Sequence, residues 1–147
     1  MHREVVVHAP LDAAFEFFAD AANLERLTPS WLRFSIRTPM PVAMRVGLEI
    51  EYRIHLYGIP IRWVTVIDVW EPGRRFVDRQ ISGPYLWWRH EHRFEAVGDA
   101  TRVIDDVDYR PRAAWMTGRL VTRDVERIFD YRQAELRRIF RTPQEKA

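Results

Sequence analysis

The sequence GPYLWWRHEHRF, residues 83–94, begins with a Gly-Pro turn and then alternates between two kinds of residue. One set of alternate positions is apolar except for two histidines: Leu86, Trp88, His90, His92 and Phe94. The positions between them are charged except for one tryptophan: Trp87, Arg89, Glu91 and Arg93. This period of two predicts a half-buried β-strand with both histidines on the side that faces the core. Two buried imidazoles need hydrogen-bond partners, so the question is which other residues reach them.

The composition indicates a folded protein with a single domain, residues 1–147. The hydrophobic fraction is 47% and the charged fraction is 30%, as in ordinary globular proteins. The absence of cysteine excludes disulfides and thiolate catalysis. The sequence has no run of about 18 apolar residues and no visible signal peptide, so we expect a cytoplasmic protein without stable membrane insertion.

The charge balance argues against nucleic acid as a partner. Lys+Arg 23 and Asp+Glu 21 leave a formal net charge of only +2. Acidic residues stand beside the arginines along the whole chain, and there is no unbroken basic run of the kind that follows a phosphate backbone. We therefore expect no nucleic-acid partner.

Patterns elsewhere in the chain place this strand in a larger sheet. Alternating apolar residues bounded by turns predict six more strands: residues 3–8, 32–38, 48–57, 61–71, 74–82 and 101–109. Helical spacing predicts two short helices after the first strand, in 13–20 and 23–28, and one long helix over 117–141. This order predicts an α+β fold, in which a curved antiparallel sheet of about seven strands wraps around a long C-terminal helix with space between the layers.

The long helix carries one residue that does not fit its apolar stripe. Residues on one face at about 100° per position form this stripe: Val121, Val125, Ile128, Leu136 and Ile139. Arg132 falls in the middle of it. A guanidinium stays charged, so a buried Arg132 needs an acceptor. Either its side chain extends outward along its stem, or it meets carboxylates or a ligand anion inside.

The sheet offers partners for these buried polar groups. Asp78 and Gln80 share a strand face with an apolar neighbour, and so does Asp105. If these faces point at the helix, six polar side chains converge inside the protein: Asp78, Gln80, His90, His92, Asp105 and Arg132.

The length of the loop at Gly83-Pro84 decides whether Asp78 reaches the histidines. A two-residue loop places Asp78 opposite Arg89, whereas a loop of three or five residues places it near His90. We expect the longer loop, because the shorter one turns Asp78 and Phe76 outward.

The two histidines have three interpretations. They are core histidines bonded to nearby carboxylates, or pocket residues that orient a ligand or transfer a proton, or metal ligands. The spacing of His90 and His92 puts both rings on one face, but the sequence does not identify a third ligand. We therefore assign no metal ligand and no cofactor. Arg132 has two interpretations, a structural ion pair with Asp78 or Asp105 and recognition of a ligand anion.

Two loops are candidates for the mouth of a cavity. Met40 and Met44 lie in a proline-containing loop between strands, and Trp115 and Met116 precede the long helix. Thioethers adapt to apolar ligands of varied shape, although the same residues are also common core plugs. Further apolar lining is expected from three residues in the sheet and the long helix: Trp88, Phe94 and Ile128.

Four stretches carry a resemblance to a known superfamily: VVVHAPLDAAFEFFADAANLERLTP at 5–29, GIPIRW at 58–63, FVDRQISGPYLWWRHEHRF at 76–94 and IFDYRQAEL at 128–136. Together they resemble the START-like, Bet v 1-like (SRPBCC) superfamily, which includes polyketide cyclase/dehydrase-like proteins. The middle stretch resembles a bacterial subgroup of unassigned function. The resemblance implies the helix-grip fold and an apolar cavity that binds lipids, sterols, quinones or polyketides in various members. The superfamily shares no catalytic motif, so no catalytic residue is transferred.

These observations predict a protein that binds a small, mostly hydrophobic ligand of the lipid, quinone, polyketide or aromatic type between the sheet and the C-terminal helix. The alternative is a cyclase or dehydratase, in which His90 or His92 acts as base, Asp78 or Asp105 tunes it, and Arg132 stabilises an enolate. A third alternative is an interaction module, for which the exposed Trp87 is the argument. The oligomeric state, monomer or homodimer, is left open.

Overall fold

The sheet of this computed structural model has seven strands in the order β1-β7-β6-β5-β4-β3-β2, and every neighbouring pair is antiparallel. The structure describes residues 1–112 and 114–141, apart from the side chains of residues 114–117. The strands are β1 His2–Val7, β2 Ser35–Ile36, β3 Glu49–Leu56, β4 Ile59–Glu71, β5 Arg75–Ser82, β6 Tyr85–Val97 and β7 Ala100–Pro111. The predicted helix-grip α+β fold is confirmed.

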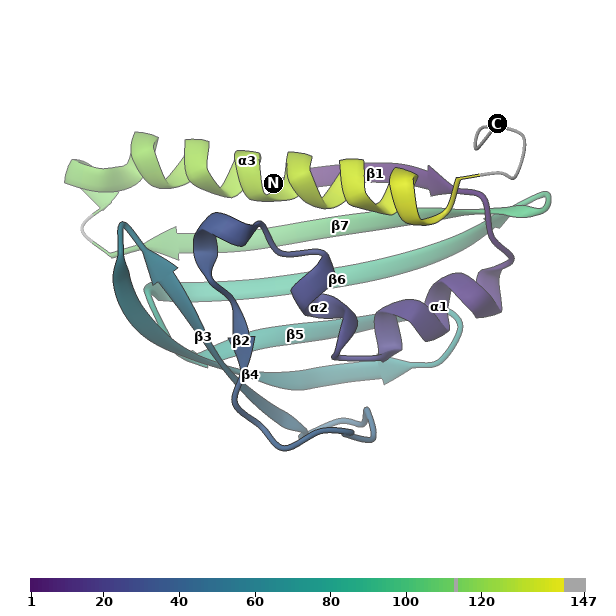
Figure 1. Cartoon of the computed structure of the whole chain (residues 1–147), viewed down its shortest axis with the longest axis horizontal. Helices are drawn as coiled ribbons and strands as arrows, with labels where there is room; N and C mark the ends of the chain where they lie inside the picture. The colour runs from purple at the N-terminus through teal and green to yellow at the C-terminus, as the bar shows by residue number, and fades with distance from the viewer. Residues whose placement is uncertain (113, 142–147) are drawn as a thin grey trace.

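In the described part of the chain, one long helix and three short helical segments accompany the sheet. They are α1 Leu11–Ala19, α2 Asn23–Arg26, the 3-10 helix η1 Ser30–Leu32 and α3 Ala114–Ile139. Helix α3 runs along β1 and β7, while the sheet curves away towards β3 and β4, and the short helices lie between α3 and these far strands (Figure 1). Within the described parts of the chain, no helix is long and apolar enough to cross a membrane.

The β5–β6 hairpin has the register that brings Asp78 to the histidines. Asp78 pairs with His90 across the two strands, which confirms the longer loop. The side chain of Gln80 braces this loop, because its Nε2 donates to the Tyr85 carbonyl at 2.8 Å and its Oε1 accepts from the Tyr85 amide at 3.3 Å. Asp78 therefore faces inward from β5.

The predicted alternation of β6 fails at its first residues. The pairing of β6 with β7 shifts register between Tyr85 and Trp87, so the chain does not alternate across this β-bulge. Tyr85 is buried in consequence, whereas Leu86, predicted to face the core, is 55% exposed. Trp87 is exposed as predicted.

Strands β2 and β4 are among those whose boundaries differ from the prediction. Strand β2 contains only Ser35–Ile36, because η1 occupies the start of the predicted 32–38 strand. Strand β4 begins at Ile59 and not at 61, because Tyr57 and Gly58 form a two-residue turn with φ of 52° and 80°. Positive φ at both central positions is the geometry that fits the twist of a tight hairpin.

The apolar core consists of two clusters of buried side chains. The first joins α1, the sheet and the end of α3 through residues that include Phe15, Phe18, Phe76, Phe94 and Leu136. The second joins β3, β4, β6 and α3 through residues that include Ile54, Trp63, Trp88, Val125 and Phe129. A buried polar group lies between the two clusters, since His92 contacts Phe76 of the first and His90 contacts Phe129 of the second.

Candidate functional site

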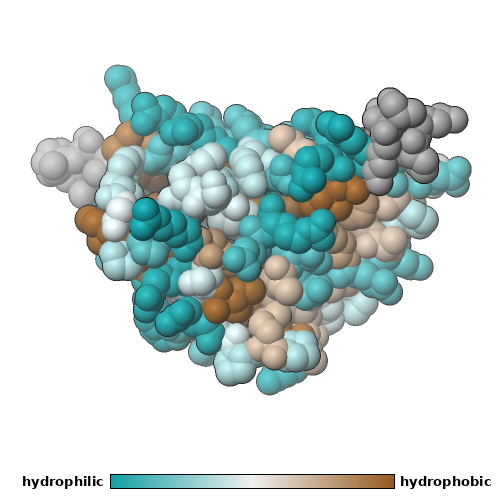
Figure 2. Space-filling model, in the orientation of Figure 1, coloured by the Kyte–Doolittle hydropathy of each residue, from teal (hydrophilic) through white to brown (hydrophobic). Residues whose placement is uncertain are grey.

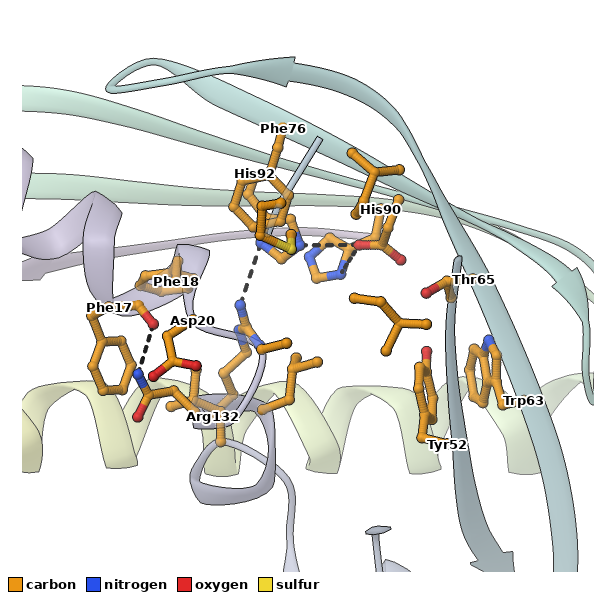
Figure 3. A pocket seen from close by; sticks show the side chains of 18 of the residues that line it. Phe17, Phe18, Asp20, Tyr52, Trp63, Thr65, Phe76, His90, His92 and Arg132 are labelled. Atoms are coloured by element: carbon orange, nitrogen blue, oxygen red, sulfur yellow. Dashed lines mark hydrogen bonds and ion pairs between the residues drawn. The ribbon is translucent and has the colours of Figure 1, made fainter. Parts of the chain in front are cut away.

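Three adjacent strands and the long helix supply the buried polar group. On β6, His90 lies between Asp78 of β5 and Val107 of β7, and His92 lies between Phe76 and Asp105. The period of two on each strand directs all of these side chains to the face that α3 covers. Arg132 reaches them from α3, as Figure 3 shows from close by.

Asp105 is the centre of this group, with a relative exposure of 1%. One of its oxygens, Oδ1, lies 2.9 Å from His90 Nε2 and 2.9 Å from His92 Nδ1, and the other accepts from Arg132 Nε at 3.2 Å. Burial by itself raises the pKa of a carboxyl group. The Arg132 charge and the bonds from both histidines outweigh burial and hold the pKa of Asp105 well below its usual range. Asp105 is therefore ionised and paired.

The two ring nitrogens of each histidine have different neighbours. His92 Nδ1 lies 2.9 Å from Asp105 Oδ1 and 3.3 Å from Arg132 Nη2, and its Nε2 lies 3.2 Å from Asp78 Oδ2. His90 Nε2 donates to Asp105, which leaves a lone pair on Nδ1. Among the described residues this Nδ1 has no hydrogen-bond partner, and it lies 3.9 Å from Asp78 Oδ2. Burial and the neighbouring His92 lower the pKa of His90 to about 4, so this ring is neutral near pH 7.

Aromatic side chains hold the imidazoles and the guanidinium in place. The His92 ring stacks on Phe76 with 4.1 Å between centroids and 23° between planes, and the centroids of His90 and His92 are 3.7 Å apart. Arg132 Cζ lies 5.1 Å from the centroid of Phe18 and 6.0 Å from that of Phe129. These contacts limit rotation of the polar side chains, so the group is preorganised.

Two adjoining chambers lie between the sheet and α3, each with a volume of about 120 Å³. The first chamber is bounded by α1, strands β3 to β6 and Arg132 of α3, and it contains Asp78, His90 and His92 in its wall. In Figure 3, Phe17 and Phe18 close one side of it and Tyr52 and Trp63 the other.

The second chamber continues towards β3 and the middle of α3. Most of its wall is apolar, with Ile54, Tyr85, Val125 and Phe129 among its residues. Several residues line both chambers: Leu24, Leu27, Tyr52, Trp63, Trp88, His90 and Arg132. The outer face over this region is largely hydrophilic, with hydrophobic residues gathered near its centre (Figure 2). The arrangement provides an apolar space with one polar wall.

Most residues predicted for the site lie at the two chambers. The first chamber includes Asp78, His90, His92, Arg132, Met44 and Trp88, and the second includes Ile128. Asp105 lies behind the histidines and contacts them from the side away from Asp78.

The other predicted residues lie elsewhere. Gln80 is the brace of the β5–β6 loop. Phe94 packs in the first core cluster, because Phe15 and Phe18 of α1 fill the space in front of it. Met40 is 38% exposed and is not part of either chamber wall, since its loop directs the side chain to solvent. The side chains of Trp115 and Met116 lie outside the part of the chain that the structure describes.

The sequence interpretation missed cavity residues on β3 and β4. Tyr52 and Trp63 face each other at 5.7 Å between ring centroids, and both line the two chambers. Burial and the nearby charge of Asp78 raise the pKa of the Tyr52 hydroxyl well above its ordinary value. The alternation of residues 48–57 already placed Tyr52 on the same face as Ile50 and Ile54, which was the available signal.

A curved sheet over a long helix, with a cavity between them, is the helix-grip arrangement. Solved structures with a similar fold match nearly the whole chain. Protein CV1439 from Chromobacterium violaceum has a TM-score of 0.77 and 12% identity, over 97% of each chain. The Zhui aromatase/cyclase from Streptomyces sp. R1128 has a TM-score of 0.73 and 20% identity, over 95% of this chain and 94% of that chain. The allergen structure Ara h 8.0201 has a TM-score of 0.61 and 13% identity, over 92% and 95%.

The chain belongs to the family described as "Domain of unknown function (DUF8410)", whose model matches residues 55–140. A search of curated protein sequences finds no match. At these identities the solved structures support the fold, and the function has to be argued from the site.

Proposed function

We propose that the chain binds a small, mostly hydrophobic molecule with one polar group, held between the sheet and α3. The observation that carries this proposal is a pair of apolar chambers with a preorganised polar group in one wall. Apolar walls supply affinity at roughly 25 cal/mol per Å² of buried surface, and the polar wall fixes orientation.

The size of the chambers favours a ligand with one or two rings, or a short acyl chain. An apolar cavity of roughly 150 Å³ is large enough for benzene. Each chamber, at about 120 Å³, is comparable, and the two adjoin. A quinone or a small aromatic compound fits this space better than a sterol. The fold shared with an aromatase/cyclase supports the aromatic class.

The free polar atoms favour a ligand that donates hydrogen bonds. Arg132 is engaged by Asp105 and His92. His90 Nδ1 and the Asp78 carboxylate remain as acceptors at the chamber wall, with the Asp78 side chain 17% exposed. Because Arg132 is paired with Asp105, it is not free to pair with a ligand carboxylate. We therefore propose a phenol or hydroquinone and not a carboxylate as the ligand class.

The test compares two ligands of similar shape, of which only one has a hydrogen-bond donor. Chelator-treated protein is titrated with 1-naphthol and with 1-methylnaphthalene, and binding is followed by calorimetry or by tryptophan fluorescence. We expect 1-naphthol to bind about 10- to 100-fold more tightly, because a hydrogen bond to a charged acceptor is involved. Asp78→Asn should reduce that preference. If the wild-type protein binds both compounds with equal affinity, the proposal that the ligand donates a hydrogen bond to the chamber wall is contradicted.

A matched pair of variants tests the location. Ala21 is buried at the wall of the first chamber, whereas its neighbour Ala22 is exposed. Ala21→Leu fills part of the chamber and should weaken binding, while Ala22→Leu should leave it unchanged. Thermal melts of both variants verify that the fold is retained. Equal binding by the two variants would place the ligand elsewhere.

An enzyme of the cyclase or dehydratase type is the second candidate. It is favoured by the convergence of His90, His92, Asp78 and Arg132 on one cavity and by the fold shared with an aromatase/cyclase. Two observations weigh against it. A general base works best with a pKa near the operating pH, and that of His90 is about 4. Arg132 is already paired. Loss of water from a poly-β-ketone substrate, followed by mass spectrometry, is the measurement that would favour this candidate.

A further inference from the structure

We propose that Asp78, His90 and His92 bind a divalent transition-metal ion, with zinc as the reference case, at the wall of the first chamber. This inference goes beyond hydrophobic ligand binding. From the sequence the two histidines lacked a third ligand, and the structure supplies it from the neighbouring strand, where Asp78 pairs with His90.

The distances between the three side chains suit one ion. Each residue offers a ligand atom, and these atoms all lie within 4.8 Å of one another. Asp78 Oδ2 is 3.2 Å from His92 Nε2 and 3.9 Å from His90 Nδ1. Bonds of roughly 2.0–2.2 Å put neighbouring ligand atoms of a tetrahedral zinc ion about 3.3–3.5 Å apart. Asp78 is therefore already within about half an ångström of this spacing from each histidine, and no pair of ligand atoms is more than 4.8 Å apart.

One nitrogen with a free lone pair already lies beside the proposed metal position. His90 is 6% exposed, and among the described residues its Nδ1 has no hydrogen-bond partner. His90 lines the first chamber, so this lone pair is available to a group bound there. Coordination of an ion next to Asp78 would use this lone pair.

The groups behind the histidines are those that support metal-bound imidazoles. Ligating histidines almost always direct their other nitrogen at a carboxylate or carbonyl. Here Asp105 Oδ1 lies 2.9 Å from His90 Nε2 and 2.9 Å from His92 Nδ1. With an ion on His92 Nε2, that ring carries its proton on Nδ1 and donates it to Asp105, and Arg132 retains its bond to the other carboxylate oxygen. One buried carboxylate then orients both ligands.

The charge and type of the ligands define the class of ion. Two imidazoles and one carboxylate suit zinc, iron(II), cobalt or nickel better than magnesium or calcium, which prefer oxygen alone. An ion at this position would lie beside the Asp78 carboxylate, which, unlike that of Asp105, is not paired with Arg132. Three protein ligands leave at least one coordination position open, and this position faces the chamber.

The test uses Zn²⁺ and Co²⁺ as probes on the full chain, with any purification tag removed. The protein is treated with chelator, desalted and titrated, with stoichiometry from elemental analysis and geometry from the visible d–d absorption of Co²⁺. We expect one equivalent of either ion. Asp78→Asn, His90→Gln and His92→Gln should each lower the affinity by about 100-fold or more, and Asp105→Asn by about 10- to 100-fold.

The control is Asp106→Asn. Asp106 is the next residue on β7, faces the opposite side and bonds to His2 at the surface. Its substitution should leave the affinity unchanged, so a loss there would overturn the proposal by assigning the ion to the surface pair. Unchanged affinity in folded Asp78→Asn, or no Co²⁺ spectrum from the wild-type protein, would also overturn it. Ligand titrations in chelator-treated protein are independent of these outcomes, so failure of the metal site is distinguishable from failure of the proposed function.

Discussion

Arg132→Ala is expected to destabilise the fold strongly, because it leaves the Asp105 carboxylate buried without its counter-charge. The two side chains are 8% and 1% exposed, and Arg132 Nε lies 3.2 Å from Asp105 Oδ2. At an effective dielectric constant of about 20, two unit charges at this distance attract by about 5 kcal/mol.

Two effects bring the expected loss to about 3–5 kcal/mol of unfolding free energy. The carboxylate keeps its contacts with His90 Nε2 and His92 Nδ1, at 2.9 Å each, and these offset part of the lost attraction. The lost packing of the guanidinium over Phe18 acts in the opposite direction. The loss should be smaller at acid pH, where protonation of Asp105 removes the unpaired charge.

The assay is urea denaturation at pH 7, with Arg93→Ala as the matched control. Arg93 pairs with Asp106, the neighbour of Asp105 on the other face of β7, and its side chain is 42% exposed. An exposed pair contributes about 1 kcal/mol or less, so the two variants should differ by at least about 2 kcal/mol. A double variant with Asp105→Asn should recover part of the loss. Equal losses from Arg132→Ala and Arg93→Ala would refute the argument that Arg132 neutralises a buried charge.

Three further expectations follow from the same structure. The pKa of His90 is about 4 in the folded protein, below its ordinary value of 6.5, so on acidification the unfolded chain binds a proton before the folded protein does. The unfolding free energy of chelator-treated protein should therefore fall as the pH decreases from about 6.5 to about 4. Denaturation series at several pH values should show a flatter slope for His90→Gln. Gln80→Ala removes both bonds to the Tyr85 backbone and should lower the unfolding free energy by about 1–3 kcal/mol, and an unchanged denaturation midpoint would contradict the bracing role. Leu136→Ala, at a fully buried position of α3, should lose about 2–5 kcal/mol, whereas Leu120→Ala, at a position 41% exposed, should lose less than about 1 kcal/mol in the same melts.

The fold was predictable because its strands are long and one face of each is buried. In 48–57 and 83–94, alternation alone identifies which side chains face the core, and the apolar stripe of α3 identifies its buried side. Arg132 stood out for the same reason, since a charge in such a stripe is rare. The β-bulge at Leu86 was not predictable, because bulges depend on pairing with another strand and not on residue type.

The site was predictable to the extent that it depends on strand faces. His90, His92 and Asp105 follow from alternation, and Asp78 follows once the loop length is chosen correctly. The sequence could not show which part of each strand lines the cavity and which part is covered by a helix. Phe94 shares its face with His92 yet lies beyond the cavity, because α1 covers that end of the sheet. The extent of the chambers depends on which helix covers which part of the sheet.

The position of Asp105 couples stability to the geometry of the cavity wall, and this affects how variants are interpreted. Any substitution of Asp105 or Arg132 leaves a buried charge behind, so a loss of binding in such a variant does not separate a role in binding from a role in folding. Asp78 differs, because its carboxylate is partly exposed at the chamber and, among the described residues, its hydrogen bond comes from His92. Asp78→Asn removes the charge and keeps the shape. It is therefore the substitution that separates the chemistry of the site from the stability of the fold.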